Sequence, residues 1–201
     1  MDFSAITDKL PNLGYKVSEF ETARDAAEYL GKEIKNKTVG FGGSVTLEQM
    51  KLYEILSKSN TVYWHQRISG GASDTKIRQL ANSADIYISS VNALAKTGEI
   101  VNIDGNCNRV ASLLYGHEKV YLVIGRNKIR ETYEEALFRA RNIAAPLNAK
   151  RVGAKTPCAV KADKCYDCNS SQRICRGLCV LWAPPMIGEY VILLINEDLG
   201  Y

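Results

Sequence analysis

The chain of 201 residues is 46% hydrophobic and 24% charged, with a formal net charge of +4, which is typical of a globular protein. Nucleic-acid-binding domains concentrate basic side chains much more strongly, so this charge does not favour a nucleic-acid partner. The longest apolar run, residues 191–195, is too short to span a bilayer, and no signal peptide is visible. We therefore expect a cytoplasmic protein with neither a membrane nor a nucleic-acid partner.

Apolar periodicity predicts strands that alternate with helices along the chain. In chain order we expect a strand at 14–18, a helix at 22–34, a strand at 38–42, a helix at 46–57, a strand at 61–64, a helix at 77–84, a strand at 85–89, a hairpin around 97–98, a short helix at 107–115, a strand at 119–125, a helix at 133–147 and a strand at 189–195. Thr22 and Asp25 have capping-box spacing before the first helix, and Thr46 and Gln49 have it before the second. This alternation is typical of an α/β fold with a mostly parallel sheet.

Five of the six cysteines lie within residues 153–183, a segment without apolar periodicity. Their spacing is C-x6-C-x2-C-x6-C-x3-C, which gives Cys158, Cys165, Cys168, Cys175 and Cys179. In a reducing compartment, clustered thiols favour a metal over disulfides. The first four thiolates suit tetrahedral zinc or an iron–sulfur cluster, and we slightly favour the cluster, with the fifth cysteine as a spare. Reversible disulfides and unrelated thiols are the alternatives.

Two polar stretches predict ligand contacts. In VGFGGSVTLEQ, residues 39–49, Gly42, Gly43 and Ser44 stand between a strand and a helix N-terminus, where backbone N–H groups can approach an anion. A tight turn is the simpler interpretation of these glycines. The stretch matches neither the dinucleotide fingerprint nor Walker A, so we predict no nucleotide cofactor.

The second polar stretch, residues 97–111, contains Asp104, Asn108 and Arg109, and an arginine there is suited to gripping a carboxylate or phosphate. Glu99 is a candidate nucleophile or general base, with a solvated turn residue as the alternative. His65 follows a predicted strand and is a weaker candidate. Seven basic residues are most simply solvated helix and loop faces: Arg126, Lys128, Arg130, Arg139, Arg141, Lys150 and Arg151.

Taken together, several motifs resemble the LUD-domain (lactate-utilisation) family, in particular a stand-alone branch with a C-terminal cysteine segment. They are GFGGSVTLEQM, SVNALAKTGEIVNIDGNCNRVA, VIGRNKI, RNIAAPLNAKR, TPC…KCYDCNSSQRIC and NEDLGY. The resemblance implies a three-layer α/β fold similar to the group of ribose-5-phosphate isomerase, glucosamine-6-phosphate deaminase and CoA-transferase. On this basis we expect a core at 1–152, a metal-binding insertion at 153–183, and a last strand within 184–201 that completes the core.

The resemblance also implies a role in oxidising lactate or a related 2-hydroxy acid, with iron–sulfur partner subunits. It implies a small anionic metabolite held by Gly42, Gly43, Ser44, Asp104, Asn108 and Arg109, and a homodimer is compatible with the fold group. Cys107 departs from the glycine that we would expect in its loop. Two alternatives stay open. One is an enzyme of the CoA-transferase or isomerase type, with Glu99 as nucleophile and a structural zinc; the other is a non-catalytic subunit of a redox complex.

Overall fold

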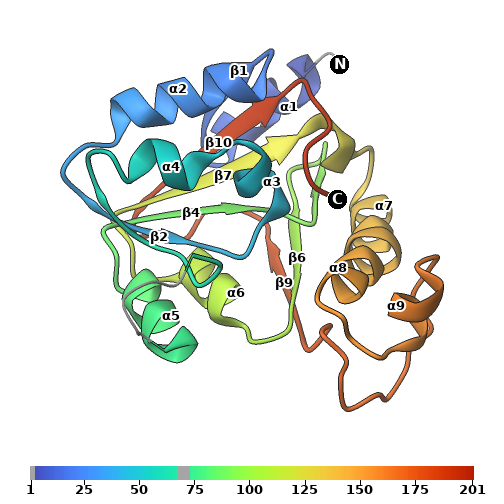
Figure 1. The fold of residues 1–201 in the computed structure, drawn as a ribbon. Helices are drawn as coiled ribbons and strands as arrows, with labels where there is room; N and C mark the ends of the chain where they lie inside the picture. Colours follow the sequence, from blue (N-terminus) through green and yellow to red (C-terminus); the bar gives the residue numbers. More distant parts are fainter. Residues whose placement is uncertain (1–2, 68–72) are drawn as a thin grey trace.

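A six-stranded sheet forms the centre of the computed structural model, which describes residues 3–67 and 73–201 (Figure 1). The strand order is β1-β10-β7-β4-β2-β3, and all five neighbouring pairs are parallel. The strands are β1 (Lys16–Phe20), β2 (Thr38–Phe41), β3 (Thr61–Tyr63), β4 (Ile86–Ser90), β7 (Lys119–Gly125) and β10 (Glu189–Ile195). The predicted parallel sheet is therefore confirmed.

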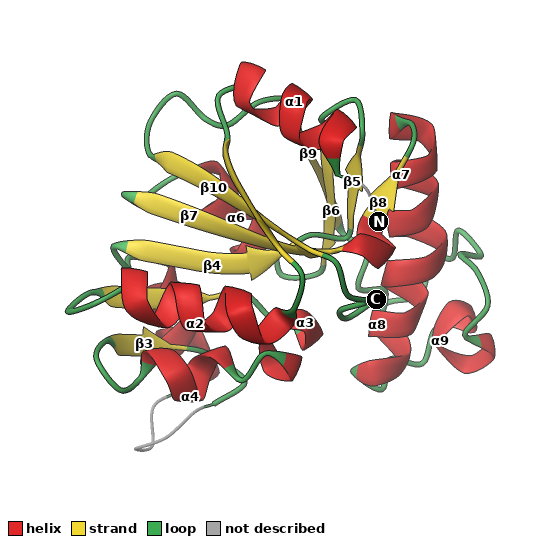
Figure 2. Cartoon of the chain, turned by 90° about the horizontal axis from the view of Figure 1, so that it is seen from above, coloured by secondary structure: helices red, strands yellow, loops and turns green. Residues whose placement is uncertain are grey.

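Helices pack on both faces of this sheet, because successive strand residues point to opposite sides (Figure 2). In β10, Val191 and Leu193 pack in one buried cluster, and Ile192 and Leu194 pack in another. The first cluster includes residues of α2 (Ala23–Glu33), α3 (Val45–Gln49) and α4 (Leu52–Leu56). The second includes residues of α1 (Ser4–Asn12), α5 (Asp74–Asn82) and α6 (Asn108–Leu114). The predicted three-layer α/β class is confirmed.

A smaller second sheet has the order β8-β5-β6-β9. Its strands are β5 (Ala93–Ala95), β6 (Ile100–Asp104), β8 (Ile129–Arg130) and β9 (Gly177–Leu181). The predicted hairpin is the antiparallel pair β5–β6, and β9 pairs with β6, also antiparallel. A third buried cluster joins Ala93, Ala95 and Val101 of this sheet to Ala136 and Ala140 on the neighbouring helix.

The helix that packs on the second sheet is longer than predicted. It starts as α7 (Tyr133–Arg139), passes through the π-helical stretch η2 (Ala140–Ala144) and continues as α8 (Ala145–Arg151). After it come the short helix α9 (Pro157–Lys161) and then β9, while the 3-10 turn η1 (Arg126–Lys128) follows β7. The cysteine segment therefore ends in a strand of the second sheet.

The predicted helix at 46–57 is wrong as a single element. Lys51 adopts the left-handed backbone conformation, with φ of 53°, and separates α3 from α4. Ser44, rather than Thr46, caps α3, because its hydroxyl accepts the N–H of Leu47 at 3.3 Å. The sequence analysis also did not predict α1, β8, α9 or β9. None of the helices within residues 3–67 and 73–201 has the length and apolarity to cross a membrane.

Candidate functional site

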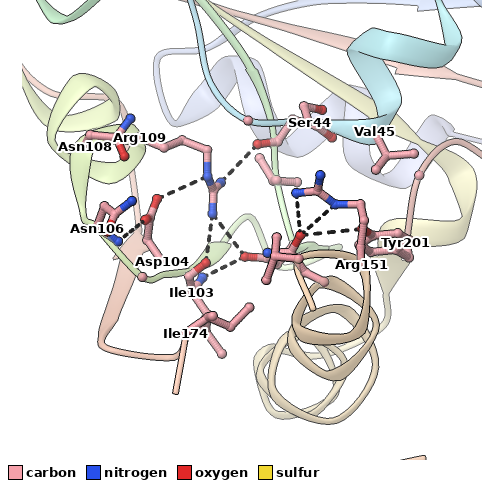
Figure 3. A pocket seen from close by; sticks show the side chains of 18 of the residues that line it. Ser44, Val45, Ile103, Asp104, Asn106, Asn108, Arg109, Arg151, Ile174 and Tyr201 are labelled. Atoms are coloured by element: carbon pink, nitrogen blue, oxygen red, sulfur yellow. Dashed lines mark hydrogen bonds and ion pairs between the residues drawn. The ribbon is translucent and has the colours of Figure 1, made fainter. Parts of the chain in front are cut away.

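A pocket of about 340 Å³ lies where β2 and β4 end and where the chain continues after β7 (Figure 3). Ligands of open α/β sheets bind in crevices outside the carboxyl ends of the strands, so this position is the expected one. Lining residues come from the loop after β2, the end of β4, the turn after β7, the loop after β6, the helix α8 and residues 173–176 of the cysteine segment. Further lining residues come from α3, α5, α6, the loop after β3 and the end of the chain, so segments that are far apart in sequence build one site.

Lys128 is the deepest cation of the pocket, with only 3% of its surface exposed. Its amine donates to the Thr46 hydroxyl at 2.9 Å and to the Ser90 hydroxyl at 2.8 Å. Within residues 3–67 and 73–201 it forms no ion pair with a carboxylate. Burial, together with the nearby charges of Arg139 and Arg109, lowers the pKa of Lys128 to about 7. A buried amine without an acidic partner is costly, and a bound anion would provide that partner.

Arg109 lines the pocket as predicted, but the protein itself uses its guanidinium. The guanidinium pairs with Asp104 Oδ2 at 3.3 Å, a contact that Figure 3 shows as a dashed line. It also donates to four further oxygens: Asn102 Oδ1 at 2.5 Å, the Ile103 carbonyl at 2.9 Å, the Ser90 carbonyl at 3.3 Å and Asn92 Oδ1 at 3.3 Å. These contacts occupy all the N–H directions of an arginine. Arg109 therefore fixes the end of β6 against the end of β4.

Asp104 and Asn108 also lie at the pocket, where protein groups orient them. The Asp104 Oδ1 atom accepts the N–H groups of Asn106 at 3.1 Å and Cys107 at 3.0 Å. Cys107 has φ of 61°, the left-handed conformation that favours glycine, at the position where the sequence departs from the expected glycine. Asn108 Oδ1 accepts from Arg78 at 3.1 Å. The predicted trio Asp104, Asn108 and Arg109 is thus brought together.

The glycine loop contributes Gly43 and Ser44 to the pocket wall, whereas Gly42 lies behind it. A Cβ atom on Gly42 would lie 2.8 Å from Ser89 Oγ, and one on Gly43 would lie 3.2 Å from His65 Nε2. Both glycines therefore allow close packing within the protein. His65 lines the pocket as a neutral side chain, since burial lowers its pKa to about 4.

Arginines dominate the rest of the lining. Arg78, Arg151, Arg173 and Arg176 join Arg109 and Lys128, while Asp104 is the single carboxylate side chain among the described lining residues. Such a concentration of one charge in a cleft attracts ligands of the opposite charge. The sequence analysis missed this group because Arg173 and Arg176 stand in the cysteine segment and Arg151 at a helix end.

Lys128 and Arg139 were predicted to be solvated, and that prediction is wrong for both. Each is only 3% exposed. Arg139 donates to the backbone carbonyls of Asn127 and Asn92, at 2.9 and 2.5 Å. The one signal that could have identified Lys128 is its position three residues after the buried strand β7, where a parallel sheet opens toward its ligand site.

Glu99 lies away from these residues. It occupies the turn between β5 and β6, and its carboxylate accepts a hydrogen bond from the Thr97 hydroxyl. Asp104 is at the opposite end of β6, roughly 16 Å along the chain at the usual strand rise. The structure therefore does not place the predicted nucleophile in the pocket.

The cysteines of residues 153–183 are all free and half-buried. Cys165 Sγ accepts the N–H of Asp167 at 3.3 Å, and Cys175 Sγ accepts from Arg173 at 3.4 Å. Among the described residues, no three Cys, His, Asp or Glu side chains come together as a metal site would require. The thiols as arranged do not fit a metal, so we derive no step through one, and the quartet of Cys158, Cys165, Cys168 and Cys175 stays a prediction.

Comparison with known proteins shows similarity over almost the whole chain. The profile of the LUD domain matches residues 4–195. A solved structure of a DUF162 family protein from Deinococcus radiodurans is similar, with 13% sequence identity, coverage of 96% of both chains and a TM-score of 0.55. No curated protein matches the chain.

Two more distant solved structures share part of the architecture. Ribose 5-phosphate isomerase A from Neisseria gonorrhoeae is 13% identical over 57% of each chain, with a TM-score of 0.36. The eIF2B beta subunit from Chaetomium thermophilum is 13% identical over 66% of this chain and 44% of its own, with a TM-score of 0.33. Likenesses of this size carry no argument about function.

Proposed function

This chain belongs to the LUD domain family, which is associated with lactate utilisation, and from that premise we propose that its pocket binds a small anionic metabolite of 2-hydroxy-acid oxidation. The substrate class is lactate or a related hydroxy acid with a free carboxylate. In this proposal the chain holds and orients the acid, and redox partner subunits with iron–sulfur clusters accept its electrons.

The observation that carries the proposal is the isolation of Lys128. Its amine is buried, faces the pocket and is held by two neutral hydroxyls, Thr46 and Ser90. Hydrogen bonds between an ammonium and a carboxylate are about twice as strong as neutral ones, and most of all where water is excluded. An anion at this position would offset the cost of burying the amine.

The other lining residues have separable roles. Arg109 and Asp104 hold the loop after β6 in place, because their polar atoms are already used within the protein. Arg151 and Arg176 are exposed and attract anions toward the entrance. The carboxylate of the hydroxy acid then accepts hydrogen bonds from Lys128 at the inner end.

Isothermal titration calorimetry with lactate and glycerate tests the proposal. We expect saturable binding to the purified chain and at least a roughly tenfold weaker affinity in Lys128→Met, which removes the charge and keeps the side-chain length. Lys58→Met is the matched control, because Lys58 is exposed and outside the pocket lining. Absence of binding by both acids, or equal affinities in wild type and Lys128→Met, would contradict the proposal.

A further inference from the structure

We propose that the ligand carries two separated anionic groups, as a phosphorylated hydroxy acid does, and that it spans the pocket from Lys128 to the arginines of the cysteine segment. The inference rests on the proposed function of this pocket and adds the chemical class of its ligand. Two cationic centres, built by different parts of the fold, support it.

The inner centre is small and carries a single charge. It consists of the Lys128 amine with the hydroxyls of Thr46 and Ser90, all three residues being less than a tenth exposed. The ammonium and the Ser90 hydroxyl offer single, well-directed contacts to the two oxygens of one carboxylate, whereas the Thr46 hydroxyl donates to the Leu199 carbonyl at 3.2 Å. The inner centre therefore suits the carboxylate end of the ligand.

The outer centre consists of Arg173 and Arg176. Arg173 donates to the carbonyl and the thiol of Cys175, at 3.2 and 3.4 Å, and Arg176 donates to backbone carbonyls of Arg173 and Ser171, at 3.1 and 2.7 Å. Neither arginine forms an ion pair with a carboxylate in the part of the chain that the structure describes. Paired guanidinium groups are the usual partners of a phosphate, which carries more charge and more acceptor oxygens than a carboxylate.

The two centres lie on different walls of the pocket. The backbone N–H of Arg176 donates to the Asp104 carbonyl at 3.0 Å, which fixes this segment against the end of β6. Figure 3 shows Ser44 and Ile174 on opposite sides of the pocket. Ser44 precedes Thr46 of the inner centre, and Ile174 lies between Arg173 and Arg176 in sequence. A ligand that contacts both walls would need an anionic group at each end.

Charge and volume agree with a larger ligand. Of the cations that line the pocket, Arg78 and Arg109 pair with Asp74 and Asp104. In the described chain, the remaining four form no such pair: Lys128, Arg151, Arg173 and Arg176. One carboxylate would leave most of that charge unbalanced. The volume of about 340 Å³ falls in the range of pockets for larger ligands, ~300–1,000 Å³, and exceeds what a three-carbon acid fills.

Calorimetry with three probes of one carbon skeleton tests the inference. Glycerate carries only the carboxylate, glycerol 3-phosphate only the phosphate, and 3-phosphoglycerate both. We expect 3-phosphoglycerate to bind at least roughly tenfold more tightly than either single-group probe. Lys128→Met should weaken glycerate and spare glycerol 3-phosphate, and Arg173→Gln should do the reverse. Arg176→Gln repeats the second test and leaves the contacts of Arg173 with Cys175 intact. Arg24→Gln, on the surface of α2, is the control for the loss of one positive charge.

Each outcome separates the two proposals. If 3-phosphoglycerate binds no more tightly than the single-group probes, or if both variants weaken both of those probes alike, the two-centre inference is wrong while anion binding stands. If neither lactate nor any of the three probes binds to folded protein, the proposed function fails and the inference fails with it. Thermal melting of each variant shows that the comparison is made on folded chains.

Discussion

The Nζ atom of Lys128 lies 2.8 Å from the Ser90 hydroxyl, although 38 positions separate the two residues in sequence. The contact joins the turn after β7 to the carboxyl end of β4, two neighbouring strands of the central sheet. It holds a cation at the inner end of the pocket without neutralising it. The affinity of the pocket for anions should therefore depend on the protonation state of this single amine.

Anion binding is expected to weaken as the pH rises through 7. The pKa of Lys128 is lowered to about 7, so the amine of the free protein loses its proton above that pH, and a bound anion favours the charged form. The affinity for glycerate should fall roughly five- to tenfold between pH 6 and 8, in a calorimetric series at constant ionic strength. His65, with its pKa lowered to about 4, and Arg139, with its pKa lowered to about 10, keep their charge states in this window. A Lys128→Met variant should show a flat profile, and an unchanged slope in that variant would assign the effect to another group.

The same titration affects stability in a defined direction. Because the pKa of Lys128 is lower in the folded chain than in the unfolded one, the unfolded state binds more protons between about pH 7 and 10. The free energy of unfolding of the wild type should therefore rise with pH in that interval relative to Lys128→Met. Urea unfolding of both proteins at pH 7 and 9 measures the difference. Parallel changes in the two proteins would show that the buried amine does not titrate as described.

The main effect of Arg109→Ala should be a lower stability of the fold, not a direct loss of a ligand contact. The side chains of Arg109 and Asp104 are only 11% and 10% exposed, and removing one partner leaves the other charge buried. Breaking such a pair costs about 3–5 kcal/mol, measured as the change in free energy of unfolding in urea. Arg24→Ala, at an exposed arginine of α2, should change it by about 0.5 kcal/mol or less. A stable Arg109→Ala protein that has lost anion binding would instead show that Arg109 contacts the ligand directly, as the sequence predicted.

Gly40→Ala tests the packing that brings β2 against α5. A Cβ atom at Gly40 would lie 2.2 Å from the carbonyl oxygen of Ala81, a backbone atom that cannot rotate away. Overpacking of this kind costs about 1–3 kcal/mol or more, so the variant should melt at a lower temperature than wild type. Lys58→Ala, at an exposed position, is the control. Equal melting temperatures for Gly40→Ala and wild type would mean that α5 can shift without cost.

The cysteine quartet is tested by metal and sulfide analysis of protein purified without oxygen. The quartet predicts iron with acid-labile sulfide, lost in the double variant Cys165→Ser/Cys168→Ser and kept in Cys107→Ser, whereas thiols that stay as the structure arranges them would hold neither. To bind a cluster, the loop between α9 and β9 would have to change conformation so that its thiols come together, because the structure does not group them as a metal site. Zinc without sulfide would make the segment a structural site, and chains free of both metals would rule the quartet out.

The sequence by itself determined the order of the secondary structure and the class of the fold. Strands such as β7 and β10 and the helix α2, with its Thr22 cap, were predicted because alternation, helical periodicity and capping depend on residues that are close in sequence. The same local signals failed at Lys51, where a left-handed residue divides a helix, and in the cysteine segment, where β9 forms only because β6 is there to pair with it. Family motifs extended this prediction to nearly the whole chain.

Only the tertiary structure decided which candidates form the site. From the sequence alone Lys128 is predicted to be a surface lysine, and only the structure places Thr46 and Ser90 beside it. Likewise, Arg109 is predicted to have a guanidinium that is free to bind a ligand, and only the structure shows its partners on β4 and β6. Glu99 and Asp104 are five residues apart in sequence, yet Glu99 lies in the turn before β6 and Asp104 at the far end of that strand. Burial, pairing and charge at a site depend on groups contributed by distant segments, and no local pattern encodes which of those groups will meet.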